Sequence, residues 1–134
     1  MREQVGKALV NKAVRLAALG RSKDELAVYE EVLARFGSAT ESVLREMVAK
    51  ALVNMGIRLG ALGRNEDELL VYDDVLTRYD GDTALELCEQ VAKALFNKGL
   101  ALGVLERTDE QIHAYQGVLA RFGSRGEPDR KSVV

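Results

Sequence analysis

Residues 48–79, VAKALVNMGIRLGALGRNEDELLVYDDVLTRY, contain the pattern that decides the fold, because the chain contains this pattern three times. Residues 1–43 are identical to residues 44–86 at 23 of 43 positions, and residues 44–86 match residues 87–129 at 17 positions. A fixed period of this length is typical of repeat proteins. We therefore expect repeats at 1–43, 44–86 and 87–123, and a tail or the truncated start of a fourth repeat at 124–134.

Within each copy, apolar residues recur at steps of three and four residues, the period of an amphipathic helix. In the second copy they predict a first helix of about 22 residues, which ends near Leu62-Gly63 because glycine suits the left-handed terminus of a helix. A second helix of about 14 residues is expected to begin at a capping box. Each copy contains such a box, as Ser22-x-x-Glu25, Asn65-x-x-Glu68 and Thr108-x-x-Gln111.

A helical hairpin of this kind cannot cover its own apolar stripe, so neighbouring copies must stack. We expect an all-α fold, an α-solenoid of three helix-turn-helix repeats with the stub of a fourth. The stripe of the second helix includes one tyrosine per copy, which we expect in the core: Tyr29, Tyr72 and Tyr115. No polar capping helix is visible at either end, so the outer faces of the first and last copies are expected to be adhesive.

Composition excludes several classes of function. The 19 Lys and Arg against 21 Asp and Glu give a net charge of −2, which lacks the excess of basic residues that nucleic-acid binding needs. A single cysteine, Cys88, and a single histidine, His113, supply neither an intramolecular disulfide nor a His/Cys metal cluster. We expect a protein that is not an enzyme, needs no metal or cofactor, and has no nucleic-acid partner.

Membrane insertion and secretion are also not expected. Uncharged runs such as 51–57 are far shorter than the roughly 20 residues that cross a bilayer, and Met1-Arg2-Glu3-Gln4 opens no secretory signal. We therefore expect a soluble, cytoplasmic chain without a membrane partner. In that reducing compartment Cys88 would be a free, partly exposed thiol, and His113 a surface residue.

The first copy contains the residues Ala8-Leu9-Val10-Asn11-Lys12-Ala13, Leu16, Leu19-Gly20-Arg21, Leu26, Tyr29 and Val32-Leu33. With these residues and their equivalents, the segments 8–37, 51–80 and 94–123 resemble a tetratricopeptide repeat. The resemblance implies a right-handed superhelix in which the first helix of each repeat lines a concave groove. The period of 43 residues exceeds the usual 34 and is similar to that of the extended repeats of kinesin light chains. The chain departs from the family, which has small residues there, at Glu25, Glu68, Gln111, Val32, Val75 and Val118.

Two polar residues, four positions apart on the first helix, recur in every copy and would form two rows after stacking. The lysine row is Lys7, Lys50 and Lys93, and the asparagine row is Asn11, Asn54 and Asn97. Apolar side chains lie beside the asparagines, namely Val14, Ile57 and Leu100 together with Val10, Val53 and Phe96. In the family that the chain resembles, asparagines at this position can bind the main chain of an extended peptide, since an amide both donates and accepts hydrogen bonds.

These rows predict a protein-protein interaction module that binds an extended peptide, and the lysines favour a ligand with acidic residues. The carboxylate clamp of chaperone-binding members does not map, because its asparagine position falls on Val14, Ile57 and Leu100. Alternatively, the asparagines link adjacent helices and the lysines only keep the surface soluble. A second hypothesis is a structural array that self-associates through uncapped ends. A third, RNA binding, is opposed by the net charge.

Overall fold

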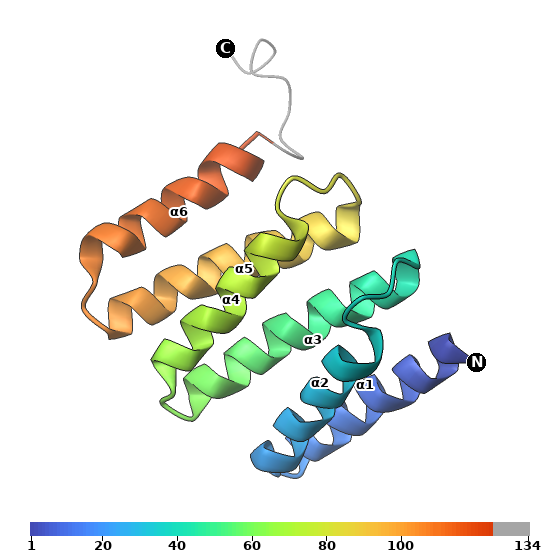
Figure 1. Cartoon of the computed structure of the whole chain (residues 1–134). Coiled ribbons are helices and arrows are strands. Elements are labelled where there is room, and N and C mark those ends of the chain that lie inside the picture. Colours follow the sequence, from blue (N-terminus) through green and yellow to red (C-terminus); the bar gives the residue numbers. More distant parts are fainter. Residues whose placement is uncertain (125–134) are drawn as a thin grey trace.

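The computed structural model describes residues 1–124, and over this range it contains six helices and no strand (Figure 1). The predicted all-α class is therefore confirmed. The expected start of a fourth repeat falls almost entirely on residues 125–134, which lie outside the described residues. The helices are α1 (Arg2–Ala18), α2 (Ser22–Phe36), α3 (Ser42–Ala61), α4 (Asn65–Tyr79), α5 (Leu85–Val104) and α6 (Thr108–Phe122).

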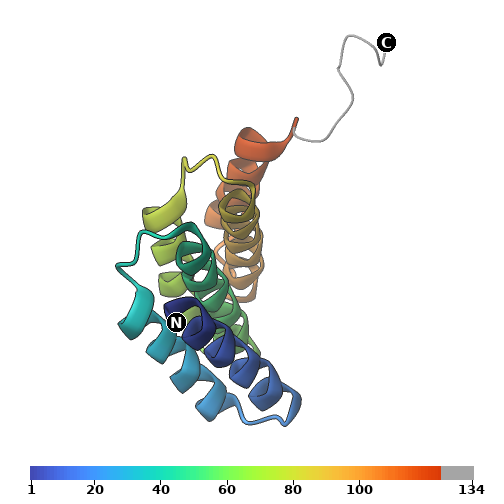
Figure 2. The same cartoon turned by 90° about the vertical axis from the view of Figure 1, so that its right-hand side faces the viewer.

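The helices form three hairpins, α1–α2, α3–α4 and α5–α6, which stand side by side in chain order (Figure 1). Each helix packs against the next one, and the odd-numbered helices also contact one another, whereas the even-numbered helices do not. Figure 2 shows α2 and α4 on one side of the array, with α1, α3 and α5 on the other. The odd-numbered helices therefore form one continuous layer.

In α2 and α4 the core follows the stripe that the repeat predicts, whereas the prediction that Tyr115 of α6 lies in the core is wrong, since this side chain is only half-buried. Val32 and Val75 are completely buried, and so is Tyr72, because the odd-numbered helix of the following hairpin covers this face of α2 and α4. The last hairpin is different, since Leu119 on α6 is 67% exposed although its counterpart Leu76 is partly buried. Burial of the even-numbered helices therefore depends on the presence of a following repeat.

The turns inside the hairpins need a left-handed residue after the odd-numbered helix. Gly20 and Gly63 adopt φ of 72° and 77°, which glycine tolerates without strain. In the third copy Glu106 holds the same place with φ of 58°, an uncommon conformation for a residue with a side chain. Glycine at the first two turns ends the helix where the sequence predicts.

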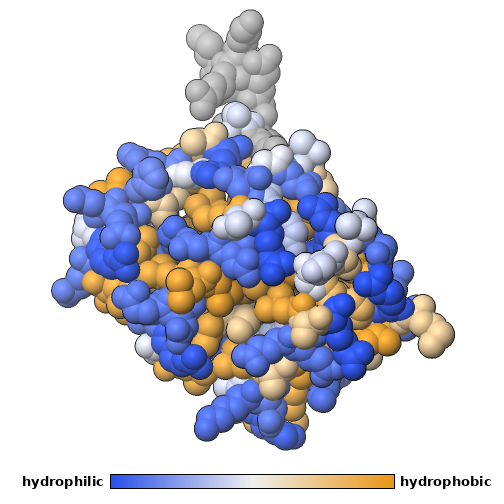
Figure 3. All heavy atoms as spheres, in the orientation of Figure 1, coloured by the Kyte–Doolittle hydropathy of each residue, from blue (hydrophilic) through white to orange (hydrophobic). Residues whose placement is uncertain are grey.

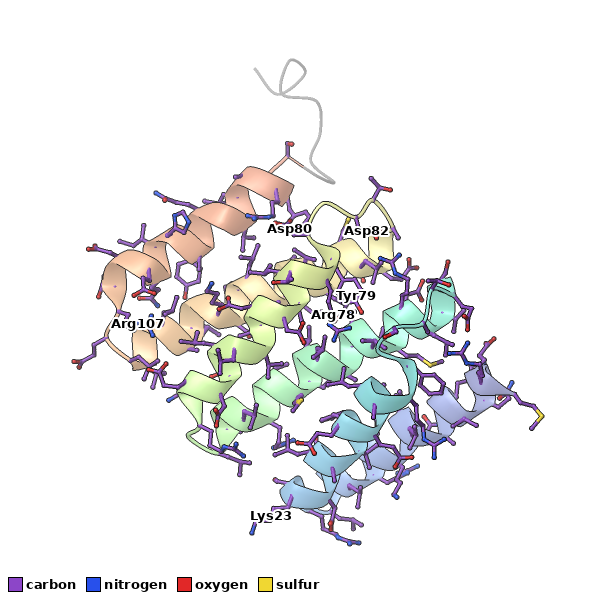
Figure 4. The ribbon with its side chains drawn as sticks, in the orientation of Figure 1. Lys23, Arg78, Tyr79, Asp80, Asp82 and Arg107 are labelled. Atoms are coloured by element: carbon purple, nitrogen blue, oxygen red, sulfur yellow. The ribbon has the colours of Figure 1, made fainter. Side chains whose placement is uncertain are left out.

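Arginines near the ends of α4 and α6 connect even-numbered helices whose backbones do not pack against each other. The Nη1 of Arg78 donates to the carbonyl oxygen of Gly37, 2.8 Å away, at the end of α2. One repeat later, Arg121 binds both carboxylate oxygens of Asp80, at 2.9 and 2.8 Å, and this guanidinium lowers the pKa of Asp80. Figure 4 shows Arg78 and Asp80 near the same end of α4. These links hold successive hairpins in register.

Two adjacent leucines of α4 test whether stacking stabilises the fold. Leu69 is buried with Ala101 and Leu102 of α5, whereas Leu70 is 68% exposed. Leu69→Ala is expected to lower the free energy of unfolding by about 2–5 kcal/mol because it leaves a cavity between repeats. Leu70→Ala, the matched control, is expected to change it by about 0.5 kcal/mol or less. Urea denaturation measures both, and equal effects would contradict the stacked arrangement.

Candidate functional site

The asparagine row lies on the odd-numbered helices, one residue per helix. Asn11 on α1 and Asn54 on α3 are exposed, and Asn97 on α5 is half-buried. Within residues 1–124, none of these three amide side chains makes a hydrogen bond to a neighbouring helix. The amides therefore retain donors and acceptors that can bind another molecule.

The lysine row lies one turn earlier on the same helices. Lys7 forms an exposed ion pair with Glu3, 3.1 Å away and one turn before it on α1, which stabilises the helix by only about 0.5 kcal/mol. Lys50 and Lys93 are exposed on α3 and α5. The ammonium groups are therefore on the protein surface, where they would attract carboxylates.

A third row consists of apolar side chains that are exposed although their neighbours are in the core. Val14, Ile57 and Leu100 occupy equivalent positions on α1, α3 and α5 and are 57%, 44% and 47% exposed. Phe96 on α5 is also exposed, whereas Val10 is half-buried. The prediction that Val53 offers apolar contact to a ligand is wrong, because Val53 packs into the core. Repeated exposure of large apolar side chains on one layer is typical of interaction surfaces.

The structure brings some of the predicted residues together in a cavity of about 210 Å³ between α3, α4 and α5. Ile57, Asn97 and Leu100 line this cavity, whereas Asn11, Val14 and the three lysines do not. The remaining lining residues are Gly60, Ala61, Asn65, Glu68, Tyr72, Ala101 and Val104. We call this space the junction cavity, since residues of the second and third repeats form it.

The predicted capping boxes are wrong, and the acidic residues in them have another role. No side-chain hydrogen bond caps α2, α4 or α6, whose first helical residues are Ser22, Asn65 and Thr108. The carboxylates instead point into the core, where the hydroxyl of Tyr29 donates to Glu25 at 2.6 Å and that of Tyr72 donates to Glu68 at 2.8 Å. Burial, followed by the hydrogen bond to the acid, raises the pKa of both tyrosines. Each carboxylate therefore pairs with a buried hydroxyl one turn later and not with the backbone N–H groups at the start of its helix.

The two buried acids differ in their cationic partners. In the first repeat, Nε of Arg58 on α3 donates to Oε1 of Glu25 at 2.8 Å. The position of Arg58 is taken one repeat later by Ala101, so that among the described residues no cation pairs with Glu68. Burial raises the pKa of Glu68, and the hydrogen bond from Tyr72 opposes this effect.

A second groove, of about 360 Å³, lies between α4 and α6 on the opposite side of the array. Leu76, Leu95 and Ala114 contribute apolar walls, and the exposed His113 lies at its edge, as predicted for a surface residue. Figure 3 shows apolar atoms surrounded by polar side chains on this face. The groove exists because the backbones of α4 and α6 do not pack against each other.

Cys88 is buried, and the prediction of a partly exposed thiol is wrong. Its thiol donates a hydrogen bond to the carbonyl oxygen of Asp82, 3.0 Å away. The side chain of Asp82 accepts a hydrogen bond from the backbone N–H of Ala84. These two bonds hold the α4–α5 loop against the start of α5. Over residues 1–124 no group of three or more His, Cys, Asp or Glu side chains could bind a metal ion. In the same range no helix combines the length and the apolar character needed to span a bilayer.

Comparison of the chain with protein-family models, with curated proteins and with solved structures gives no match.

The unpaired acid predicts how stability depends on pH. The folded chain holds a proton on Glu68 more tightly than the unfolded chain does, so the free energy of unfolding decreases as the pH rises from the ordinary glutamate pKa through the raised one. Glu68→Gln is expected to remove this decrease. Denaturant titrations between about pH 4 and pH 8 measure the slope for both proteins.

Glu25→Gln is the matched control for this experiment. It removes the acid that is already paired with Arg58, and is therefore expected to destabilise the fold because the arginine loses its carboxylate partner. An unchanged slope in Glu68→Gln would show that Glu68 is not responsible for the pH dependence.

Proposed function

We propose that the chain is a protein-binding module that takes an extended segment of a partner across its odd-numbered helices. The observation that supports this proposal best is that amide and apolar side chains at equivalent positions are exposed on α1, α3 and α5, which contact one another in sequence. The resemblance to tetratricopeptide repeats, which bind peptides on this layer, supports the same interpretation.

The geometry suits an extended main chain. Neighbouring packed helices are about 10 Å apart, and an extended chain advances about 3.3 Å per residue, so each repeat would contact about three residues of the ligand. Asn11, Asn54 and Asn97 could then bind peptide N–H and C=O groups at a regular interval, whatever the ligand side chains are. The apolar row would add affinity through buried area.

The proposed module is a non-catalytic scaffold that needs no cofactor and has protein or peptide ligands. The lysine row favours acidic residues in these ligands, and neither RNA nor a membrane is a proposed partner. Cys88 as a buried free thiol suits a reducing compartment, and we propose a cytoplasmic location on this ground.

The asparagine row provides the direct test of the groove. Replacement of Asn11, Asn54 and Asn97 by alanine is expected to weaken the binding of peptides selected from a random library by about tenfold or more, since each lost hydrogen bond costs about 1 kcal/mol. Fluorescence anisotropy with labelled peptides measures the affinity.

The control variant replaces three exposed residues of the even-numbered helices, Lys23, Thr77 and Gln116, by alanine. This variant is expected to bind like the original chain. Unchanged affinity in the asparagine variant, with helicity intact by circular dichroism, would rule out the groove.

A second candidate function, self-association, is favoured by the two end faces. Ile112 and Leu119 on α6 are exposed, while their counterparts Leu69 and Leu76 lie under α5. On α1, Val5 is exposed although Val48 is buried in the next repeat. A second copy placed one repeat beyond α6 would cover both faces.

Charges at the ends agree with such a head-to-tail stack. Inside the chain, Arg107 at the start of α6 lies 3.6 Å from Glu66 at the start of α4. If a second copy follows α6 at the same repeat spacing, its Arg21 takes the role of Arg107 and Asp109 takes the role of Glu66. An arginine then again faces an acidic residue. This contact joins two different surfaces and could therefore extend beyond a dimer.

Sedimentation equilibrium tests the stack. The apparent mass of the chain is expected to rise with concentration, and Leu119→Glu is expected to abolish the rise because it places a charge in the end face. Leu70→Glu is the matched control, since Leu70 is as exposed as Leu119 but lies away from this face. A constant monomer mass for the unaltered chain would contradict self-association.

A further inference from the structure

The junction cavity contains a buried acid with one unused oxygen. Glu68 is 7% exposed, and its Oε2 accepts from Tyr72. Its Oε1 makes no hydrogen bond with any described residue, and no side-chain oxygen in this part of the chain is both fully buried and unpaired. Oε1 therefore faces accessible space, and this space is the cavity that Glu68 lines.

The neighbouring junction shows what this position can hold. Shifting each lining residue back by 43 positions gives the junction between the first and second repeats, where Glu25 and Tyr29 replace Glu68 and Tyr72. There the Arg58 side chain reaches the acid and donates to it at Oε1. In the second junction Ala101 provides only a methyl group in place of that arginine, so the acid and the tyrosine remain while the cation is missing.

We propose that the junction cavity binds an arginine side chain of the partner segment, with Oε1 of Glu68 accepting from its guanidinium as Glu25 accepts from Arg58. This inference deepens the proposed peptide-binding function and rests on it, since Ile57, Asn97 and Leu100 belong to both sites. It adds one requirement that does not follow from the lysine and asparagine rows, namely that the ligand contains an arginine.

The walls of the cavity suit such a side chain. Ile57, Leu100 and Val104 are exposed apolar residues that can pack along the aliphatic part of an arginine. The amide oxygen of Asn97 offers a second acceptor to a guanidinium, which has five donors. Glu68 is the only acidic residue among the lining residues, and no lysine or arginine competes for it there.

Electrostatics favours the bound state. A carboxylate removed from water without a counter-charge is unfavourable, and a hydrogen-bonded cation offsets this cost. The raised pKa of Glu68 is consistent with the missing counter-charge. The exposed lysines lie one turn from the asparagines, so the proposed ligand carries an arginine at the junction and acidic residues elsewhere.

The test uses two capped pentapeptides, acetyl-Ala-Ala-Arg-Ala-Ala-amide and the same peptide with citrulline, which keeps the shape of arginine but has no charge. Nuclear magnetic resonance follows the side-chain carboxyl carbon of Glu68 and the amide of Ala101 in the full-length chain. At about millimolar concentration the arginine peptide is expected to shift both signals and to move the titration of Glu68 to lower pH. The citrulline peptide is expected to bind at least about tenfold more weakly.

Two variants make the test specific. Ala101→Arg restores the pair found in the first junction, and is expected to lower the titration midpoint of Glu68 and to abolish the response to the arginine peptide. Glu68→Gln leaves the cavity open, and is expected to bind both peptides equally weakly. Equal binding of the arginine and citrulline peptides by the original chain would overturn the inference, as would an arginine response that survives in Glu68→Gln.

Failure of this inference differs from failure of the groove. If replacement of Asn11 and Asn54, which do not line the cavity, leaves the affinity for library peptides unchanged, the groove fails even though arginine still shifts the signal of Glu68. If arginine and citrulline bind equally while the asparagine variant loses its peptides, the groove stands and the cation site is rejected.

Discussion

The structure depends on the burial of α2 and α4, each beneath the odd-numbered helix of the next hairpin. Val32 and Val75 are completely buried by this contact, and the tyrosine hydroxyls pair with acids beside it. The same contact produces the exposed layer, because an odd-numbered helix that packs on its neighbours with one side presents its opposite side to solvent. The proposed binding surface and the core are therefore two faces of the same helices, and a change in stacking would alter both.

The fold could be predicted from the sequence because the same apolar pattern occurs three times in the chain. Apolar spacing located the helices to within a few residues, and exposure of Asn11, Asn54, Val14, Ile57 and Leu100 follows from their place on the helix face opposite the core. The capping boxes were predicted wrongly because their acidic side chains have two possible partners. Glu25 and Glu68 suit a helix terminus and also a tyrosine one turn later, and only tertiary burial decides between these partners.

The junction cavity could not be predicted from one repeat alone. It needs residues of two hairpins, and it also needs an alanine at the position where the first junction has an arginine. The relevant signal was nevertheless present, since Arg58 and Ala101 occupy equivalent positions and Glu25 and Glu68 depart together from the family that the chain resembles. The sequence does not show which side chains lie close together across two hairpins. Only the structure shows that Arg58 reaches the acid of the preceding hairpin, so that its replacement by alanine leaves an acid without its cation.

The two joints of the array are tied by different sets of charged residues. The second joint is fastened at both edges, by Arg121 with Asp80 and by Arg107 with Glu66. The first is fastened at one edge by Arg78, while Arg64 at the other edge has Lys23 in the place of Glu66. Arg64 pairs instead with Asp67 of α4. The first joint is tied by the buried pair of Arg58 with Glu25, which has no equivalent at the second joint because Ala101 replaces Arg58.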